Sequence, residues 1–209
     1  GVYGPGAYMT KYGGDASTYG SNVMPVYASL QNPYTAAPGE ARRAKKEGGT
    51  KAWSRAIQDK GHDGIVLQDM SVVVAFRPEQ IKSATGNNGN FDGANPDIRF
   101  GRTTAATDAA PSLSFGQPTG YTFTESEYRP SVVAFAKTRF GDSVAPNGKP
   151  AWQNFTRWFG DSQVVDADGK PLVVYHGSPT ATFTEFYVGN VGAFFSDRFD
   201  VAASYAGGY

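Results

Sequence analysis

The sequence has no cysteine, so neither a disulfide bond nor a thiolate metal site can hold this fold together. It has no net charge, since 19 basic side chains balance 19 acidic ones, and this does not favour nucleic acid or a membrane surface as a partner. No apolar run approaches the roughly 20 residues that cross a bilayer. We therefore expect a soluble globular protein, and 209 residues suffice for one large or two small domains.

Glycine, proline and aromatic residues are plentiful, which favours short strands and many turns over a helical bundle. Apolar and β-branched runs predict strands at 23–30, 64–67, 72–76 and 172–176. Helical spacing of apolar residues predicts helices within 40–60, broken at Gly48-Gly49, and at 151–160, with a short helix within 125–140. The Gly-, Asn- and Pro-rich stretch that begins at Asn87 has the composition of a linker.

One string occurs twice in the chain. GAYMTKYGGDASTYG at 6–20 aligns without a gap with GAFFSDRFDVAASYA at 192–206. The alignment sets Tyr8 against Phe194 and Tyr19 against Tyr205. A repeat of this kind indicates a duplicated structural unit.

The second copy follows a strand that ends in a histidine. LVVYHGS puts His176 at the end of an apolar run, and Gly177 lets the backbone approach a ligand closely. Phe194 and Tyr205, 11 residues apart, can face each other across a cleft and sandwich a flat ring. This set suits a planar heterocycle that bears an amide, with the imidazole available to a ribose hydroxyl. Taken singly, His176 also suits a structural role, and Phe194 a place in the core.

HGS followed by GAFFSDRFDVAASY resembles the NAD-binding core of ADP-ribosyltransferases, in the poly(ADP-ribose) polymerase-like branch. Residues 1–100 are similar to the C-terminal half of the ADP-ribosyltransferase domains of large phage and prophage polyvalent proteins. The resemblance implies an α+β fold with a split, mainly antiparallel β core, and NAD as substrate. It also implies that His176 contacts a ribose and that the Gly177 backbone binds the nicotinamide amide. Two aromatic side chains would stack on the nicotinamide ring: Phe194 and Tyr205, or Tyr8 and Tyr19 in the first copy.

The chain matches the family least well at the position of the catalytic carboxylate. Many active relatives carry a glutamate near the start of a late strand, where this chain reads Gln68-Asp69-Met70-Ser71-Val72. Asp69 is the nearest carboxylate and becomes the candidate catalytic carboxylate. The missing glutamate favours mono-transfer or NAD hydrolysis over polymerisation, or no catalysis.

From these observations we expect three segments. Residues 1–100 would be the C-terminal part of a first ADP-ribosyltransferase-like domain, 101–150 a largely irregular linker, and 151–209 the N-terminal part of a second domain. Two arrangements stay open: strand 172–176 pairs with the sheet of residues 1–100 and completes one site, or two incomplete halves are joined by a mobile linker.

The expected function is transfer of ADP-ribose from NAD to a protein of the host, without a metal, nucleic acid or membrane. The sequence leaves the localisation open; a phage-encoded effector that is delivered to or acts in the bacterial cytoplasm is one option. The alternative is a catalytically inactive binding or structural module of a phage polyvalent protein. A nuclease would need a basic cleft and a second catalytic histidine, for which the sequence has no pattern.

Overall fold

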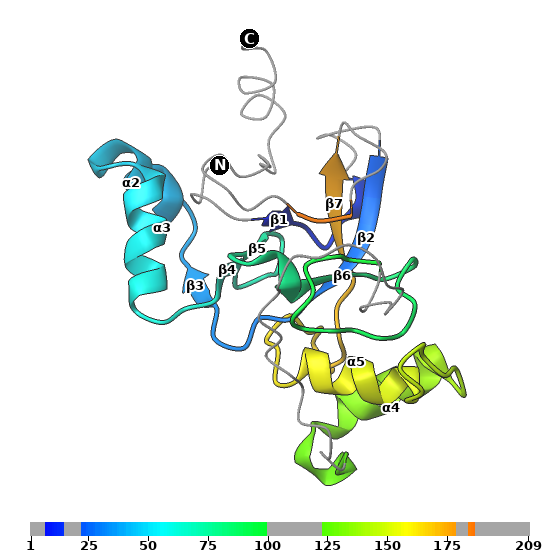
Figure 1. Cartoon of the computed structure of the whole chain (residues 1–209). Helices are drawn as coiled ribbons and strands as arrows, with labels where there is room; N and C mark the ends of the chain where they lie inside the picture. The colour runs from blue at the N-terminus through cyan, green and yellow to red at the C-terminus, as the bar shows by residue number, and fades with distance from the viewer. Residues whose placement is uncertain (1–6, 15–21, 100–122, 179–183, 187–209) are drawn as a thin grey trace.

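The computed structural model describes residues 7–14, 22–99, 123–178 and 184–186 (Figure 1). The chain order is β1 (Ala7–Met9), β2 (Asn22–Ala28), β3 (Tyr34–Ala36), α2 (Glu40–Glu47), α3 (Thr50–Asp59), β4 (Gly64–Leu67), β5 (Val73–Ala75), η1 (Pro78–Gln80), β6 (Ile81–Ser83), η2 (Glu125–Glu127), α4 (Pro130–Phe140), α5 (Ala151–Phe159) and β7 (Val174–Ser178). The expected α+β class with a split, mainly antiparallel β core is confirmed.

The strands form two sheets. One has the order β1-β5-β4-β3 and the other has the order β6-β2-β7. All neighbouring strands are antiparallel except β3 and β4, which are parallel. An isolated bridge between Thr10 and Tyr175 links the end of β1 to β7, so the two sheets meet at these strands.

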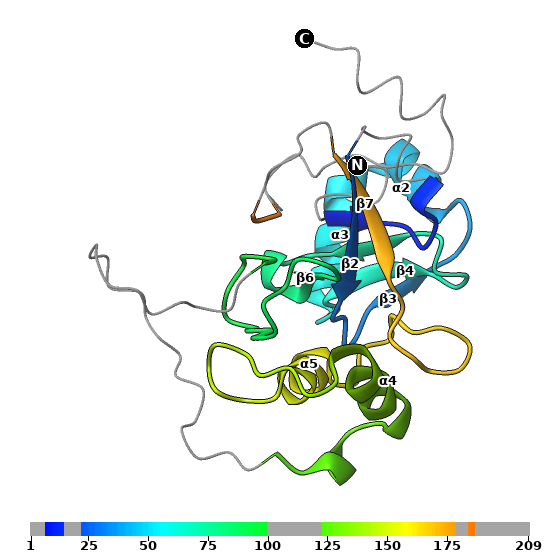
Figure 2. The same cartoon turned by 90° about the vertical axis from the view of Figure 1, so that its right-hand side faces the viewer.

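Alternation along β2 explains how the layers form, since successive side chains of a strand point to opposite faces. Val26 and Ala28 belong to the apolar cluster that also contains Val73 of β5 and Val174 of β7. Tyr27, between them, belongs instead to a second cluster with side chains of α4 and α5. Figure 2 shows β2 and β7 side by side, with α4 and α5 beyond their ends. Each sheet thus has helices on one side and shares the central core on the other.

The helix α5 is held by aromatic rings. Phe155 and Phe159 lie one turn apart on its buried face, as the helical spacing predicts. The ring of Phe155 meets Tyr27 of β2 at 5.0 Å between centroids, edge to face. Gly160 ends the helix with φ 54°, a conformation that glycine adopts without strain. The short helix expected within 125–140 is α4, and it packs against α5.

The expectation of a linker from Asn87 onward is wrong for residues 87–99. Phe91 and Ile98 of this segment are buried in the core. The segment is a series of turns in which an Asn or Asp side chain accepts a hydrogen bond from the backbone N–H two residues further along. The Gly89 N–H donates to Asn87 Oδ1, and the Asp97 N–H donates to Asn95 Oδ1. These local bonds satisfy the backbone without a helix or strand, so an Asn- and Gly-rich composition is compatible with a packed loop.

A buried lysine fastens this loop to β6. The Lys82 side chain is fully buried, and its Nζ donates to the carbonyl oxygens of Asn95 and, at 3.0 Å, of Asp97. Burial lowers the pKa of the Lys82 ammonium from 10.5 to about 8. Lysine is seldom buried in this way unless its ammonium has partners.

We expect the free energy of unfolding to rise by about 2 to 3 kcal/mol between pH 8 and pH 10. In this window only the unfolded chain keeps the Lys82 proton, because the folded pKa is about 8 and the unfolded one is near 10.5, and each pH unit adds about 1.4 kcal/mol. Below pH 8 both states hold the proton, so the cost of burying the charge is present in full. Burial raises the pKa of the Tyr27 hydroxyl, so above pH 10 the unfolded chain loses this proton more readily than the folded one. Tyr27 therefore lowers the free energy of unfolding as the pH rises in that range.

Urea denaturation at a series of pH values measures this rise. The Lys82→Met variant should show a flatter profile over the same window, because it has no proton to lose. A rise of equal size in the variant would show that another group is responsible.

Candidate functional site

The strand β7 carries His176 and Gly177 into the sheet formed by the first half of the chain. It pairs with β2 in antiparallel register, with His176 opposite Met24 and Gly177 opposite Val23. One residue earlier, Tyr175 exchanges both backbone hydrogen bonds with Thr10, whose N–H donates to the Tyr175 carbonyl at 2.9 Å. His176 therefore lies immediately beside the junction between the two sheets.

The turn between β4 and β5 approaches the same junction from the other sheet. Met9 of β1 pairs with Val73, the first residue of β5, so the turn lies next to the chain that leaves β1. Lys11 follows this strand, and its Nζ donates to the backbone carbonyl of Asp69 at 2.6 Å. Met70 adopts φ 58° within the turn, a strained conformation for a side chain of this kind. The end of β1 is therefore flanked by β7 on one side and by the Asp69 turn on the other.

Asp69 is an exposed carboxylate held by its neighbour. The backbone N–H and the hydroxyl of Ser71 both donate to Asp69 Oδ1, at 3.0 Å and 2.6 Å. These two hydrogen bonds hold the pKa of the Asp69 carboxyl below its usual value. Asp69 is therefore ionised at neutral pH, which suits the stabilisation of positive charge and makes it a weak general base.

His176 has a very different environment. Its side chain is only 3% exposed, and its ring meets the ring of Phe186 at 4.7 Å between centroids, with the planes at 81°. Phe186 is itself part of the core between the sheets. Its segment is fastened to the loop after β6, because the Ile98 N–H donates to the Thr184 carbonyl at 2.8 Å. In this structure the imidazole therefore packs as a core side chain.

The remaining candidates divide into two groups. Tyr8 lies in β1, where its backbone pairs with Val74 of β5. Tyr19, Phe194 and Tyr205 lie outside the residues that the structure describes. The strand β1, which contains Tyr8, thus lies against β7, which contains His176 and Gly177. The roles of these residues and the stacking of the aromatic side chains stay predictions.

Two further residues at the junction had no signal in the sequence. Lys11 contacts the Asp69 turn and also lies 4.9 Å from the ring centroid of Tyr12, which is 52% exposed. Ser71 supplies both hydrogen bonds that keep Asp69 ionised. The repeat does not mark Lys11, because the second copy has Asp197 at that place. Only the register between β1 and β5 brings these side chains to the candidate site.

Two other kinds of feature are absent from the part of the chain that the structure describes. Over these residues, no three His, Asp or Glu side chains gather in a way that could hold a metal ion. Nor does any helix there combine the length and the apolar character that crossing a membrane demands.

Comparison with known proteins gives one match. Residues 1–91 match the family model described as ADP-ribosyltransferase in polyvalent proteins. No curated protein and no solved structure gives a significant match. The matched segment holds β1 to β6 and the Asp69 turn, whereas β7 with His176 lies beyond it. The first 91 residues of this chain are therefore similar to the ADP-ribosyltransferase domain of polyvalent proteins.

Proposed function

We propose that this chain is an NAD-dependent ADP-ribosyltransferase of the poly(ADP-ribose) polymerase-like branch, which transfers single ADP-ribose groups to a protein or hydrolyses NAD. The observation that carries this proposal is the pairing of β7 with β2. It adds a His-Gly pair from residues 174–178 to strands from the segment similar to ADP-ribosyltransferases. We further propose that the chain holds two truncated tandem copies with 101–150 between them, whose segments contribute to one site; the pairing of β2 with β7 supports such a shared site.

In the proposed site, each residue binds a different part of NAD. The His176 imidazole holds a ribose hydroxyl, and the Gly177 backbone binds the amide of nicotinamide. Tyr8 and Tyr19 stack on the nicotinamide ring, and Phe194 and Tyr205 take these positions in the second copy. Because the His176 ring now packs against Phe186, NAD binding would have to open that contact.

Asp69 acts on the charge that develops when the bond between ribose and nicotinamide lengthens. The transition state has oxocarbenium character, and an ionised carboxylate nearby stabilises it. The hydrogen bonds from Ser71 keep this carboxylate charged and fix its orientation. Lys11 binds the backbone of the same turn and so holds it beside β1.

We expect Asp69→Asn to lower the rate of nicotinamide release by about tenfold or more. This is less than the loss usual for a buried group that stabilises transition-state charge, because water and salt screen an exposed carboxylate. The matched control is Glu79→Gln, which removes a carboxylate of the same region that pairs with Arg77. Equal rates in the Asp69 and Glu79 variants would remove Asp69 from the mechanism.

The function itself is tested with NAD labelled in the adenylate part and incubated with the full chain and a bacterial extract. Free nicotinamide together with labelled protein supports transfer. Free nicotinamide with labelled ADP-ribose alone supports hydrolysis. No release of nicotinamide from a chain that is folded by circular dichroism would overturn both.

A specific observation favours a second function, that of a catalytically inactive binding or structural module of a polyvalent protein. His176 is buried against Phe186, and the turn before β5 carries Asp69 where active relatives have a glutamate. Such a module would keep the fold and release no nicotinamide. Calorimetric titration with NAD then separates a module that still binds the dinucleotide from one that does not.

A further inference from the structure

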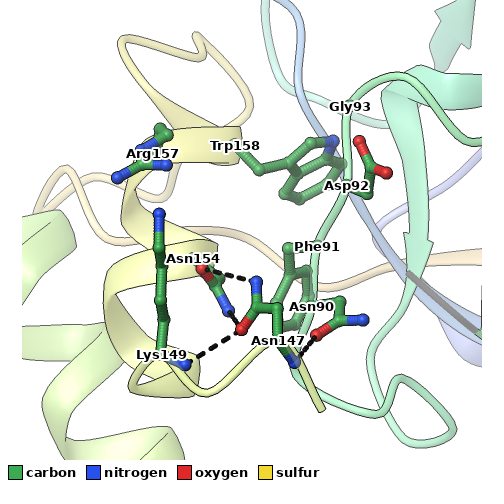
Figure 3. A pocket seen from close by; sticks show the side chains of 9 residues that line it. All are labelled: Asn90, Phe91, Asp92, Gly93, Asn147, Lys149, Asn154, Arg157 and Trp158. Atoms are coloured by element: carbon green, nitrogen blue, oxygen red, sulfur yellow. Dashed lines mark hydrogen bonds between the residues drawn. The ribbon is translucent and has the colours of Figure 1, made fainter. Parts of the chain in front are cut away.

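A cavity of about 460 Å³ lies apart from the junction of the two sheets, between α5 and the loop that follows β6 (Figure 3). Its volume falls within the range of small-molecule sites. The segment 90–93 forms one wall, and α5 with the turn before it forms the other. The lining residues that carry the argument are Asp92, Gly93, Asn147, Lys149, Arg157 and Trp158.

The two walls are tied together by side-chain amides. Asn154 Nδ2 donates to the Gly89 carbonyl at 3.1 Å and to Asn147 Oδ1 at 3.1 Å. The Asn147 N–H in turn donates to Asn90 Oδ1 at 3.2 Å. Gly89 has φ +92°, and a Cβ there would come within 2.8 Å of the Ala151 Cβ, so no other residue fits. The cavity is therefore preformed, and ordering it costs little on binding.

An aromatic ring forms the inner wall. Trp158 lies beside Phe91, with 5.8 Å between ring centroids, and its Nε1 donates to the Glu79 carbonyl at 3.2 Å. A Cβ added at Gly93 would lie in ordinary van der Waals contact with the indole edge, 3.6 Å from Trp158 Cδ1, so this segment packs against the ring. The indole is thus held in one orientation, and a flat ring can lie along it.

The charged side chains are separated along the cavity. Figure 3 shows the ammonium end of Lys149 directed toward the guanidinium of Arg157 at one end, and Asp92 beside Trp158 at the other. A phosphate bound between the ammonium and the guanidinium accepts charge-assisted hydrogen bonds from both. Asp92 Oδ1 accepts from the Ala94 N–H at 2.9 Å, which fixes the carboxylate as an acceptor at its end.

We propose that this cavity binds a phosphorylated ring compound of the size of a nucleoside monophosphate. The phosphate lies between Lys149 and Arg157, and the ring lies along Trp158. Asp92 accepts a hydrogen bond from a hydroxyl or amino group at the far end of the ligand. The site is separate from the proposed NAD site, which lies where β1 meets β7, so its occupancy does not depend on turnover of NAD.

The test is calorimetric titration of the full chain with AMP, repeated with adenosine and with inorganic phosphate. We expect AMP to bind more tightly than either part, because only AMP contacts both ends of the cavity. Lys149→Ala combined with Arg157→Ala should weaken AMP binding at least tenfold. Lys170→Ala is the matched control, since it removes an exposed cation that pairs with Asp168 elsewhere, and it should leave AMP binding unchanged.

The position of AMP is read from the three indole N–H signals in an NMR spectrum of the same chain. A shift of the Trp158 signal, with those of Trp53 and Trp152 unmoved, supports the cavity. Three results would overturn the proposal: no binding of AMP, equal weakening by the double variant and by Lys170→Ala, or shifts confined to backbone signals of β1 and β7.

Discussion

Replacing His176 by alanine is expected to lower the rate of nicotinamide release from NAD by about 100-fold, the order of loss when a substrate is no longer held in its reacting position, because the imidazole positions a ribose hydroxyl in the proposed site. The imidazole is the one side chain that β7 contributes to the proposed ribose contact. Release of nicotinamide is measured by chromatography under conditions of excess NAD.

Because His176 is buried, the variant also loses packing, so two comparisons are needed. His176→Gln keeps much of the volume and a donor, and it should retain more activity than His176→Ala at similar thermal stability. His62→Ala removes the other histidine of the chain, which lies in the turn before β4 with its Nδ1 3.1 Å from the Asn32 carbonyl oxygen. Equal activity of the His62 and His176 variants would leave His176 with a packing role alone and would favour the inactive module.

Phe155→Ala is expected to lower the free energy of unfolding by about 3 to 5 kcal/mol, the range for deletion of a fully buried phenylalanine side chain. The ring is 0% exposed and meets Tyr27 of β2 at 5.0 Å and Phe91 of the loop after β6 at 5.1 Å. Its loss therefore removes contacts between α5 and the segment similar to ADP-ribosyltransferases.

Urea denaturation followed by circular dichroism measures this effect. The control is Val144→Ala, at a position that is 67% exposed, where a change of less than about 0.5 kcal/mol is expected. A single transition shifted to lower urea shows that residues 123–178 unfold together with residues 22–99. If Phe155→Ala produced a separate early transition and left the rest unchanged, the two segments would be independent domains, and the proposed shared site would be wrong.

Local patterns predicted the helices and the strands β2, β4, β5 and β7, but not β1, β3 or β6. The β-branched run at 64–67 is β4, and the helical spacing of Phe155 and Phe159 corresponds to α5 with Gly160 at its end. These elements follow from the periodicity of buried side chains, which any short window of sequence contains. The strand expected at 172–176 lies two residues further on, as β7.

The errors arose where long-range contacts override composition. Residues 87–99 have the composition of a linker, yet Phe91 and Ile98 are buried and the Lys82 ammonium binds two of the loop carbonyls. A lysine inside a strand gives no local sign that it will be buried. Its partners come from residues 13 and 15 positions further along the chain.

The candidate site was predictable only in part. The end of a strand and a following glycine indicated His176 and Gly177, but not the contact of His176 with Phe186 or its low exposure. The sequence indicates Asp69 only as the nearest carboxylate to the place of the missing glutamate, whereas the two hydrogen bonds from Ser71 that hold this carboxylate depend on the geometry of the turn. The cavity beside Trp158 had no sequence signal, because its walls are contributed by segments more than 50 residues apart.

The sequence by itself indicated the helices and the strands β2, β4, β5 and β7, and its resemblance to ADP-ribosyltransferases carried the expectation of an NAD site. Only the tertiary structure decided that β7 pairs with β2 and meets β1 at Thr10 and Tyr175. The physical reason is that strand pairing between distant segments depends on which faces are buried together and on the register this imposes, and neither is encoded in the strand alone.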